Sequence, residues 1–241
     1  MNSIPSPDQP ITSADLESIA AFDTPTICNA LEVAAPERRG AGYTTRSAIC
    51  GFPQLKPIVG FARTARIRSK GAAIASAAEM RGLRHDYYRY IDAGPKPSIV
   101  VIQDLDGPDA GYGAFWGEVQ SAIHRGLGAL GVITDGSVRD IDQWAPAFQF
   151  LAAKIAPSHA FANLIDFGGS VEVLGMSVRN GDVVHADRHG AVVVPSSALR
   201  ALPAAAQKLA AREARILAVA RGDGCTAERL IAVFNREDEI H

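Results

Sequence analysis

The chain has 241 residues, 47% of them hydrophobic, which is enough for one large domain or two small ones. Its net charge of -2 and pI of about 6.3 argue against a nucleic-acid partner and against a polybasic contact with a membrane. We expect a cytoplasmic protein, because no apolar run is long enough to span a membrane and no signal peptide is recognisable. The three cysteines form no CxxC pair, so neither a disulfide framework nor a thiolate zinc site is expected.

The N-terminal region is predicted to hold a flexible arm and two helices. Residues 1–12 are rich in Pro, Ser and Asp, which favours the arm. Thr12 can cap the first helix. In "DTPTICNALE", Thr24 is expected to cap the second helix, with Pro25 in its first turn. Residues 40–57 contain several Gly and Pro residues and are predicted to be mostly loop.

Strands and helices are then predicted in turn. Residues 58–67, "IVGFARTARI", partly alternate apolar and polar side chains and indicate a strand. The Ala-rich residues 71–80 are predicted to be helical. The apolar run at 99–103, "IVVIQ", indicates a buried strand with a loop at its end. After a glycine-rich segment, the apolar residues of "VQSAIHRGLGAL" recur at helical spacing.

The second half of the chain begins with a short apolar run at residues 131–134. This run predicts a strand that stops at a tight turn formed by Asp135 and Gly136. "FQFLAAKIA" and "DFGGSVEVLGMSV" indicate further strands, and "GDVVHADRHGAVVVP" indicates a hairpin. From Ser196 onward the pattern predicts one long helix, a break at residues 222–224 and a short helix, "TAERLIAVF".

This order of elements favours a layered α/β domain. A strict alternation of strand and helix, which is typical of a doubly wound sheet, is missing from the chain. We therefore predict mixed sheets and a C-terminal helix in a single domain over residues 13–241.

Arg139 and Asp140 are the first candidate site residues, because they follow a predicted strand end and turn. Side chains in such places emerge at the edge of a sheet, where many α/β proteins bind ligands. The arginine fork matches a carboxylate, and aspartate oxygens suit Mg²⁺ or Mn²⁺. Together they can hold an anionic, metal-chelating molecule such as a 2-oxo acid. The alternatives are an ordinary surface ion pair, or Asp140 as the cap of a helix that begins near Ile141.

Gly117 and Glu118 are the second candidates, where the glycine-rich loop meets a helix. Free N–H groups at a helix N-terminus bind anions such as carboxylates. Alternatively, Glu118 only favours the first helical turn through its charge. The GxGxxG spacing of Gly126, Gly128 and Gly131 ends a helix instead of opening one, which argues against a dinucleotide site.

The histidines and cysteines give weaker signals. His124 lies inside a helix and is predicted to be structural, whereas His185 and His189 frame the hairpin turn and can be read as metal ligands or as part of a surface hairpin. No cysteine has a clear basic partner in the sequence, so none is assigned as a nucleophile.

Three motifs together carry a family resemblance. They are a Gly-Glu helix start at 117, a D-G-x-V-R-D segment about twenty residues later, and the G-D…D-x-x-G…V-P hairpin at 181–195. This combination resembles the regulator-of-ribonuclease-activity-A (RraA) family, which includes the class II 4-hydroxy-4-methyl-2-oxoglutarate/4-carboxy-4-hydroxy-2-oxoadipate aldolases. The resemblance covers about residues 20–224. It implies an RraA-like catalytic domain with a layered αββα sandwich, related to the swivelling phosphohistidine domain.

The resemblance also implies roles for individual residues. Arg139 is implied to bind the 2-oxo acid and stabilise its enolate, and Asp140 to ligate Mg²⁺ or Mn²⁺. Glu118 is implied to hold water bound to that metal, and Glu213, on a neighbour's C-terminal helix, to approach the same water. The resemblance further implies a homotrimer or homohexamer with its active site between subunits. The substrate carboxylate is implied to lie on the backbone amides of Gly117, Glu118, Val119 and Gln120.

The implied activity is that of a metal-dependent lyase, an aldolase or oxaloacetate decarboxylase that acts through a pyruvate enolate. A divalent ion and an arginine are the groups that this chemistry needs, because both stabilise enolate charge. Two alternatives stay open. One is a non-catalytic regulator that binds ribonuclease, and the other is a metal-dependent hydratase or isomerase of a sugar acid.

Two departures from the family pattern bear on the substrate. Gln120 stands where the aldolases often have leucine, which changes the polarity of the implied pocket. Residues 81–97 are longer, more aromatic and more basic than the family pattern leads us to expect. Arg81, Arg84 or His85 is therefore a candidate to meet a second carboxylate or a sugar-acid hydroxyl.

Overall fold

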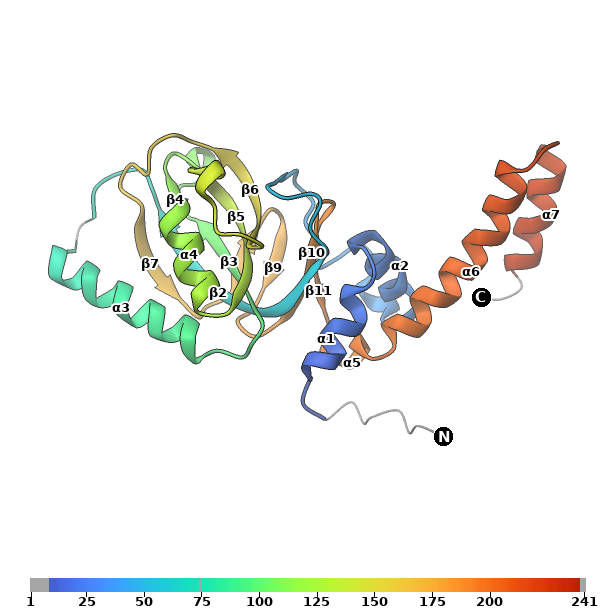
Figure 1. Cartoon of the computed structure of the whole chain (residues 1–241), viewed down its shortest axis with the longest axis horizontal. Helices are drawn as coiled ribbons and strands as arrows, with labels where there is room; N and C mark the ends of the chain where they lie inside the picture. The colour runs from blue at the N-terminus through green and yellow to red at the C-terminus, as the bar shows by residue number, and fades with distance from the viewer. Residues whose placement is uncertain (1–8, 74, 239–241) are drawn as a thin grey trace.

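The structure is a computed structural model that describes residues 9–73 and 75–238 (Figure 1). Most of the arm predicted for residues 1–12 therefore lies outside the described residues. The helices are α1 (Ser13–Ala20), α2 (Thr24–Ala34), η1 (Pro36–Arg38), α3 (Ala77–Ala93), η2 (Gly107–Asp109), α4 (Glu118–Gly126), η3 (Ile141–Gln143), α5 (Ser196–Leu199), α6 (Leu202–Arg221) and α7 (Ala227–Asp238). The strands are β1 (Ile49–Cys50), β2 (Ile58–Arg68), β3 (Ser98–Asp104), β4 (Ala114–Trp116), β5 (Ala129–Val138), β6 (Gln149–Ile155), β7 (Asn163–Phe167), β8 (Val171–Val173), β9 (Met176–Val178), β10 (Val183–Asp187) and β11 (Gly190–Val194).

A curled mixed sheet forms the centre of the fold. Its main path runs β1-β6-β5-β3-β2-β10-β11, with β4 added beside β5 and β7 beside β2. The pairs β2/β3, β3/β5, β5/β6 and β4/β5 are parallel, whereas the flanking pairs are antiparallel. A small second sheet consists of β8 and β9. The predicted mixed α/β fold is thus confirmed, with one large sheet and one two-stranded ribbon.

Apolar clusters pack on the sheet and divide the molecule into layers. One cluster joins the sheet to α3 through Tyr87 and Ile91, which share it with Trp116 of β4 and with Phe148, just before β6. A second lies between the sheet and the β8–β9 ribbon, and a third joins α1, α2, α5 and α6 to the β10–β11 hairpin. Buried strands such as β3 and β5 are nearly continuous apolar runs because both of their faces are covered.

The turn predicted at Asp135 and Gly136 is wrong, because β5 continues through both residues to Val138. The register of β5 against β6 shifts between Thr134 and Ser137, so the two residues form an irregularity within the strand. Beyond it, β5 leaves β3 and pairs with β4. A bulge bends a strand and increases its twist, which explains how β5 pairs with β3 before the irregularity and with β4 after it.

The N-terminal helices follow the sequence closely. Thr12 caps α1 through a reciprocal capping box with Asp15, as predicted. The cap of α2 is Asp23 and not Thr24, since Asp23 accepts the N–H of Thr26 at 3.0 Å. The backbone N–H of Thr24 instead donates to Asp187 of the hairpin, at 2.9 Å.

The helix predicted over residues 71–80 begins only at Ala77 and extends to Ala93. Ser76 and Glu79 form its capping box, which fixes the helix start at that point. Gly71 has a φ of +99° and lies in the loop before it. The basic and aromatic residues 81–93 therefore belong to α3.

The long helix predicted from Ser196 is two helices, α5 and α6, separated at Arg200 and Ala201. Pro203 lies in the first turn of α6, where its missing N–H is tolerated. The predicted break at residues 222–224 is confirmed, and α7 follows it. Figure 1 shows α6 and α7 extending away from the sheet as a helical pair.

Candidate functional site

The carboxyl ends of β4 and β5 lie side by side and define the site. These parallel strands pair through Ala114 with Ser137 and Trp116 with Val138. The backbone N–H of Arg139 donates to the carbonyl of Trp116 at 2.9 Å, which fixes the two strand ends together. Ligands of open α/β sheets bind at such ends, so the residues that follow both strands are candidates.

Gly117 follows β4 and starts α4. Its backbone is extended, a conformation that any residue can adopt. Glycine is needed here because neighbouring atoms leave no room for a side chain. A Cβ atom at Gly117 would lie 2.5 Å from Oδ2 of Asp140 and 3.2 Å from Cγ of Arg139. Glycine therefore allows the N-terminus of α4 to approach the two residues that follow β5.

The first turn of α4 presents backbone donors to this space. The N-cap residue, Gly117, has no side chain to cap the helix, and the N–H of Glu118 donates to Oδ2 of Asp140 in a long hydrogen bond of 3.4 Å. The next N–H groups, of Val119 and Gln120, belong to the first helical turn and have no carbonyl of their own helix to bind. A carboxylate placed here would meet donors and the positive end of the helix dipole.

Asp140 has a left-handed backbone, with a φ of 53°. Aspartate tolerates this region better than most residues, and such outliers cluster at functional sites. Its side chain does not cap η3, which begins at the next residue and has no side-chain cap hydrogen bond within the described chain. The alternative in which Asp140 caps a helix near Ile141 is thus confirmed in position, since Asp140 is the N-cap residue of η3, although its side chain makes no cap hydrogen bond there. Its Oδ2 instead lies 3.5 Å from Nε of Arg139, and both side chains remain 35% exposed.

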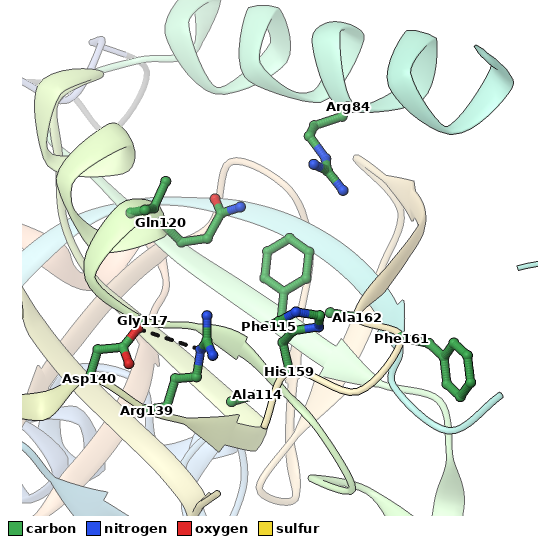
Figure 2. A pocket seen from close by; sticks show the side chains of 11 residues that line it. Arg84, Ala114, Phe115, Gly117, Gln120, Arg139, Asp140, His159, Phe161 and Ala162 are labelled. Carbon is green, nitrogen blue, oxygen red and sulfur yellow. Dashed lines mark ion pairs between the residues drawn. The ribbon is translucent and has the colours of Figure 1, made fainter. Parts of the chain in front are cut away.

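These residues open on a cavity of about 270 Å³ (Figure 2). Arg139 extends into it from below, and Arg84 reaches toward it from α3. Gln120 lies between them and exchanges hydrogen bonds of 3.3–3.4 Å with the hydroxyl of Tyr88. The complete lining is Arg84, Ala114, Phe115, Gly117, Val119, Gln120, Arg139, Asp140, His159, Phe161 and Ala162.

A buried contact between α3 and α4 holds the two walls of the cavity together. The hydroxyl of Tyr87 lies 2.9 Å from Nε2 of His124, and Nδ1 of His124 lies 2.8 Å from the carbonyl of Gln120. Both side chains are fully buried. Burial lowers the pKa of His124 to about 4, so the ring is neutral at physiological pH. The prediction that His124 is structural is confirmed.

Stability is therefore expected to depend on this histidine below pH 6.5. The unfolded chain binds a proton near pH 6.5, whereas folded His124 does so only near pH 4. Its contribution to stability is complete above pH 6.5 and is lost as the pH falls toward 4, by at most about 1.4 kcal/mol per pH unit. Urea denaturation of His124→Asn should give a smaller loss between pH 7.5 and pH 5 than the wild type gives.

The variants must be compared because the ionisation of Asp135 changes the stability with pH in the direction opposite to that of His124. Burial raises the pKa of Asp135 to about 6, so its contribution is present at low pH and is lost as the pH rises through 6. His85→Asn, on the exposed face of α3, is the matched control and should keep the wild-type pH dependence. Equal pH dependence of the wild type and His124→Asn would contradict the assignment.

Asp135 also stabilises the irregularity in β5. Its Oδ1 accepts the backbone N–H of Asp104 at 2.8 Å, and Thr134 accepts the N–H of Gly136 at 2.9 Å through its hydroxyl. These bonds replace the regular ladder where β5 leaves β3. They therefore help to fix the path of the chain at the end of β5, where Arg139 and Asp140 follow.

The structure brings together most of the residues predicted from sequence. Gly117, Val119, Gln120, Arg139 and Asp140 all line the cavity. The side chain of Glu118 is exposed and is not part of the lining, although its N–H contacts Asp140. Glu213 lies exposed on α6 and is also outside the lining, so within one chain it does not join the site.

Sequence reasoning missed the wall formed after β6. His159, Phe161 and Ala162 line the cavity from this loop, and Phe115 lines it from β4. A usable signal exists, because "FQFLAAKIA" indicates a strand and β6 is parallel to β5. A loop at the carboxyl end of a parallel strand is a standard place for binding residues.

The other candidates have structural roles. His185 is buried and contacts Oγ1 of Thr24 at 3.0 Å, so the hairpin packs under the N-terminal helices and is not a surface hairpin. His189 pairs with Asp187 at 3.1 Å. Burial raises the pKa of Cys28 to about 11 and also that of Cys50, which disfavours their reactive thiolates. Within the described residues, no three His, Cys, Asp or Glu side chains gather as a complete metal-ligand set.

A comparison with protein-family models identifies one family. A family model described as "RraA-like: Aldolase/RraA" matches residues 24–193. The uncharacterized protein MJ0644 of Methanocaldococcus jannaschii is 28% identical over 118 residues, which are 48% of this chain and 57% of that protein. The chain thus aligns with little more than half the length of this curated relative.

Two solved structures show the same fold. An uncharacterized protein from Pseudomonas syringae pv. tomato has a TM-score of 0.69 at 21% identity, covering 95% of this chain and 98% of its own. Streptomyces coelicolor RraAS2, described as an unusual member of the RNase ES inhibitor RraA protein family, has a TM-score of 0.65 at 18% identity, covering 85% and 96%. Both likenesses concern the fold alone. In the part of the chain that the structure describes, no helix is both long and apolar enough to cross a membrane.

Proposed function

The chain belongs to the RraA-like family, and from this premise we propose that it is a divalent-metal-dependent lyase that acts on a 2-oxo or hydroxy acid. The reaction is an aldol cleavage or a decarboxylation that passes through a pyruvate enolate. One observation carries the proposal. Arg139, Asp140 and the first turn of α4 converge on one cavity, although they come from separate strand ends.

The residues fit a hard divalent cation such as Mg²⁺ or Mn²⁺. Asp140 offers a partly exposed carboxylate, and Gly117 leaves open the space beside it that a side chain would fill. Mg²⁺ is commonly held by one or two carboxylates, with water and substrate oxygens as the other ligands. A single protein carboxylate is therefore sufficient when the substrate itself chelates. A cation bound at Asp140 would supply Lewis-acid charge beside the keto oxygen of the substrate.

The chain's own groups would bind and orient the substrate. The N–H groups of Val119 and Gln120 would receive the C1 carboxylate at the start of α4. The guanidinium of Arg139 would lie at the 2-oxo oxygen and stabilise the negative charge that develops there. Phe115 and Phe161 add apolar surface to the lining of the cavity, and a bound substrate that displaces water from it would strengthen these electrostatic interactions.

In the cleavage direction, the proton of the substrate hydroxyl leaves through water to Glu118. The carbon–carbon bond breaks, its electron pair moves into the enolate, and the hydroxyl carbon becomes a carbonyl. The proton then returns to C3 of the enolate and gives pyruvate. Glu118 is exposed beside the cavity, which suits exchange with water.

An activity screen tests the proposal directly. The protein is incubated with Mg²⁺ or Mn²⁺ and a panel of 2-oxo acids and sugar acids, and pyruvate release is followed. Metal-dependent pyruvate release supports the lyase. Conversion of a sugar acid without pyruvate would instead indicate the hydratase or isomerase alternative, which uses the same enolate chemistry.

The fold likeness to RraAS2 favours a second candidate function, the binding of a ribonuclease. A regulator needs only a binding surface and would tolerate the loss of Arg139 and Asp140. Unchanged inhibition of a ribonuclease by variants at both positions, with no metal-dependent turnover by the wild type, would favour this candidate.

Arg84 is predicted to select substrates with a second carboxylate. It reaches the cavity from α3, away from Arg139 and Asp140 (Figure 2). A hydrogen bond to a charged group contributes about 1.5–3 kcal/mol, so Arg84→Ala should raise KM for a dicarboxylate by about 10- to 100-fold. KM for a monocarboxylate should change little. Arg81→Ala on the same helix is the control, and equal effects on both substrates would contradict the role.

We also propose that the protein is a homotrimer or homohexamer whose site is completed by a neighbouring copy. Exposed apolar side chains on α6 and α7, namely Leu217, Ile231 and Phe234, are candidates for this contact. Glu213 on α6 would approach the site only from a second copy. Light scattering at micromolar concentration should give the mass of a trimer or a multiple of it, and a stable monomer would contradict this prediction.

A further inference from the structure

A second cavity of about 620 Å³ lies where the β8–β9 ribbon, the β10–β11 hairpin and η1 meet. Figure 1 shows β9, β10 and β11 near the middle of the molecule, with β10 and β11 beside the N-terminal helices. The cavity shares no lining residue with the candidate active site. Its volume falls within the range that is usual for small-molecule sites.

Arg38 is the most unusual residue of this cavity. Its Nε atom is buried and has no hydrogen-bond partner among the described residues. A Cβ atom at Gly42, which has a φ of +82°, would lie 1.9 Å from one terminal nitrogen of Arg38. The guanidinium is thus packed on glycine backbone. A buried donor without an acceptor is destabilising, so this guanidinium lacks a full set of partners among the described residues. The part of Arg38 that lines the cavity can donate to an anion there.

Further donors surround the same space. Arg179, in the turn between β9 and β10, adds a second arginine to the lining, and it is exposed. Asp182 is the acidic residue of the lining, and its Oδ2 accepts the backbone N–H of Arg179 at 2.8 Å. The two arginines therefore leave a net positive charge. Four hydroxyl groups add donors that rotate to suit a ligand, those of Ser170, Ser177, Ser196 and Ser197.

This donor set matches phosphate better than carboxylate. A phosphate group presents three strong acceptor oxygens, whereas a carboxylate presents two. Arginine binds either group in a bidentate manner, but two arginines and four serines exceed what two oxygens accommodate. The cavity is also larger than one phosphate needs, and Val178, Val183 and Pro195 provide apolar surface for an organic part.

We propose that this cavity is a binding site for a phosphate monoester of a small organic molecule. Arg38 and Arg179 bind the phosphate, and the serine hydroxyls complete its contacts. The site is independent of the lyase proposal, because none of its residues lines the active-site cavity.

Isothermal titration calorimetry tests this proposal with three probes, inorganic phosphate, glycerol 3-phosphate and glycerate. The wild-type protein should bind both phosphate probes saturably, with glycerol 3-phosphate the tighter. Glycerate is a hydroxy acid and could bind at Arg139, so it is compared in Arg139→Gln, which should bind glycerate at least tenfold more weakly than it binds glycerol 3-phosphate. Arg179→Gln should weaken phosphate binding at least tenfold. Arg188→Gln, in the turn of the β10–β11 hairpin and outside the cavity lining, is the matched control and should bind as the wild type does.

Two further variants test whether the phosphate binds in this cavity and not at Arg139. Arg38→Gln should also lose binding while keeping the wild-type circular dichroism spectrum, and if it fails to fold, Arg179→Gln alone decides the matter. Arg139→Gln should retain phosphate binding. Absence of saturable binding, equal binding of glycerate, unchanged binding by Arg179→Gln, or loss of binding in Arg139→Gln would each overturn the proposal.

Discussion

Replacing Asp140 by asparagine is expected to abolish divalent-metal-dependent turnover while the fold remains intact. Asparagine keeps the size of the side chain and tolerates the left-handed backbone at this position, which has a φ of 53°. It removes the negative charge that a hard cation requires. The stability change should stay within about 1 kcal/mol, because the side chain is partly exposed and lies outside the three apolar clusters.

Steady-state turnover over a range of Mg²⁺ and Mn²⁺ concentrations measures the effect. Asp142→Asn, an exposed aspartate two residues later in η3, is the matched control and should behave as the wild type. Asp140→Ala should lose activity equally and should be less stable than Asp140→Asn, since alanine is disfavoured at positive φ. Wild-type turnover and metal dependence in Asp140→Asn would show that Asp140 is not the metal ligand.

Arg139→Lys is expected to lower turnover by about 100- to 1000-fold, although the charge is kept. Loss of one preorganised donor to a developing oxyanion typically has an effect of this order. Lysine lacks the planar fork of arginine and would hold an oxygen pair in a looser geometry. The Nε of Arg139 already contacts Oδ2 of Asp140 at 3.5 Å, so the arginine is oriented before substrate arrives.

The effect should fall mainly on kcat. The charge on the enolate oxygen exceeds that on the ground-state ketone, so the lost interaction is made chiefly in the transition state. Arg125→Lys, exposed in the last turn of α4, provides a control for the substitution itself. A variant with unchanged kcat and a higher KM would make Arg139 a residue that only positions the substrate.

Both predictions depend on a site that local sequence indicated only in part. The neighbours Arg139 and Asp140 could be found because they follow an apolar run, and Gly117 because it precedes a helical pattern. The contact between the two segments could not be found, since Asp140 lies 22 positions after Glu118, whose N–H it accepts. That contact arises from parallel pairing of β4 with β5, and such pairing depends on non-local hydrogen bonds.

The sequence by itself determined the elements whose signals are local. A capping residue, hydrophobic periodicity and turn residues predicted α1, β2, β3, α4 and the β10–β11 hairpin, because these signals act over a few residues. The motif set also indicated the family, which the match over residues 24–193 confirms.

Only the tertiary structure decided the features that depend on distant partners. The irregularity at Asp135 resembles a turn in sequence, but pairing with β4 and β6 keeps the chain extended. Arg84 lies on α3, whereas His159 and Phe161 lie in the loop after β6, and nothing in the sequence indicates that these two segments line the same cavity. The surroundings of Arg38 also depend on tertiary structure, because Gly42 and residues of the β10–β11 hairpin pack near it only in the folded chain. Cavities of this kind are formed by sheet pairing and core packing between segments that are far apart in the sequence, so no short stretch of sequence predicts them.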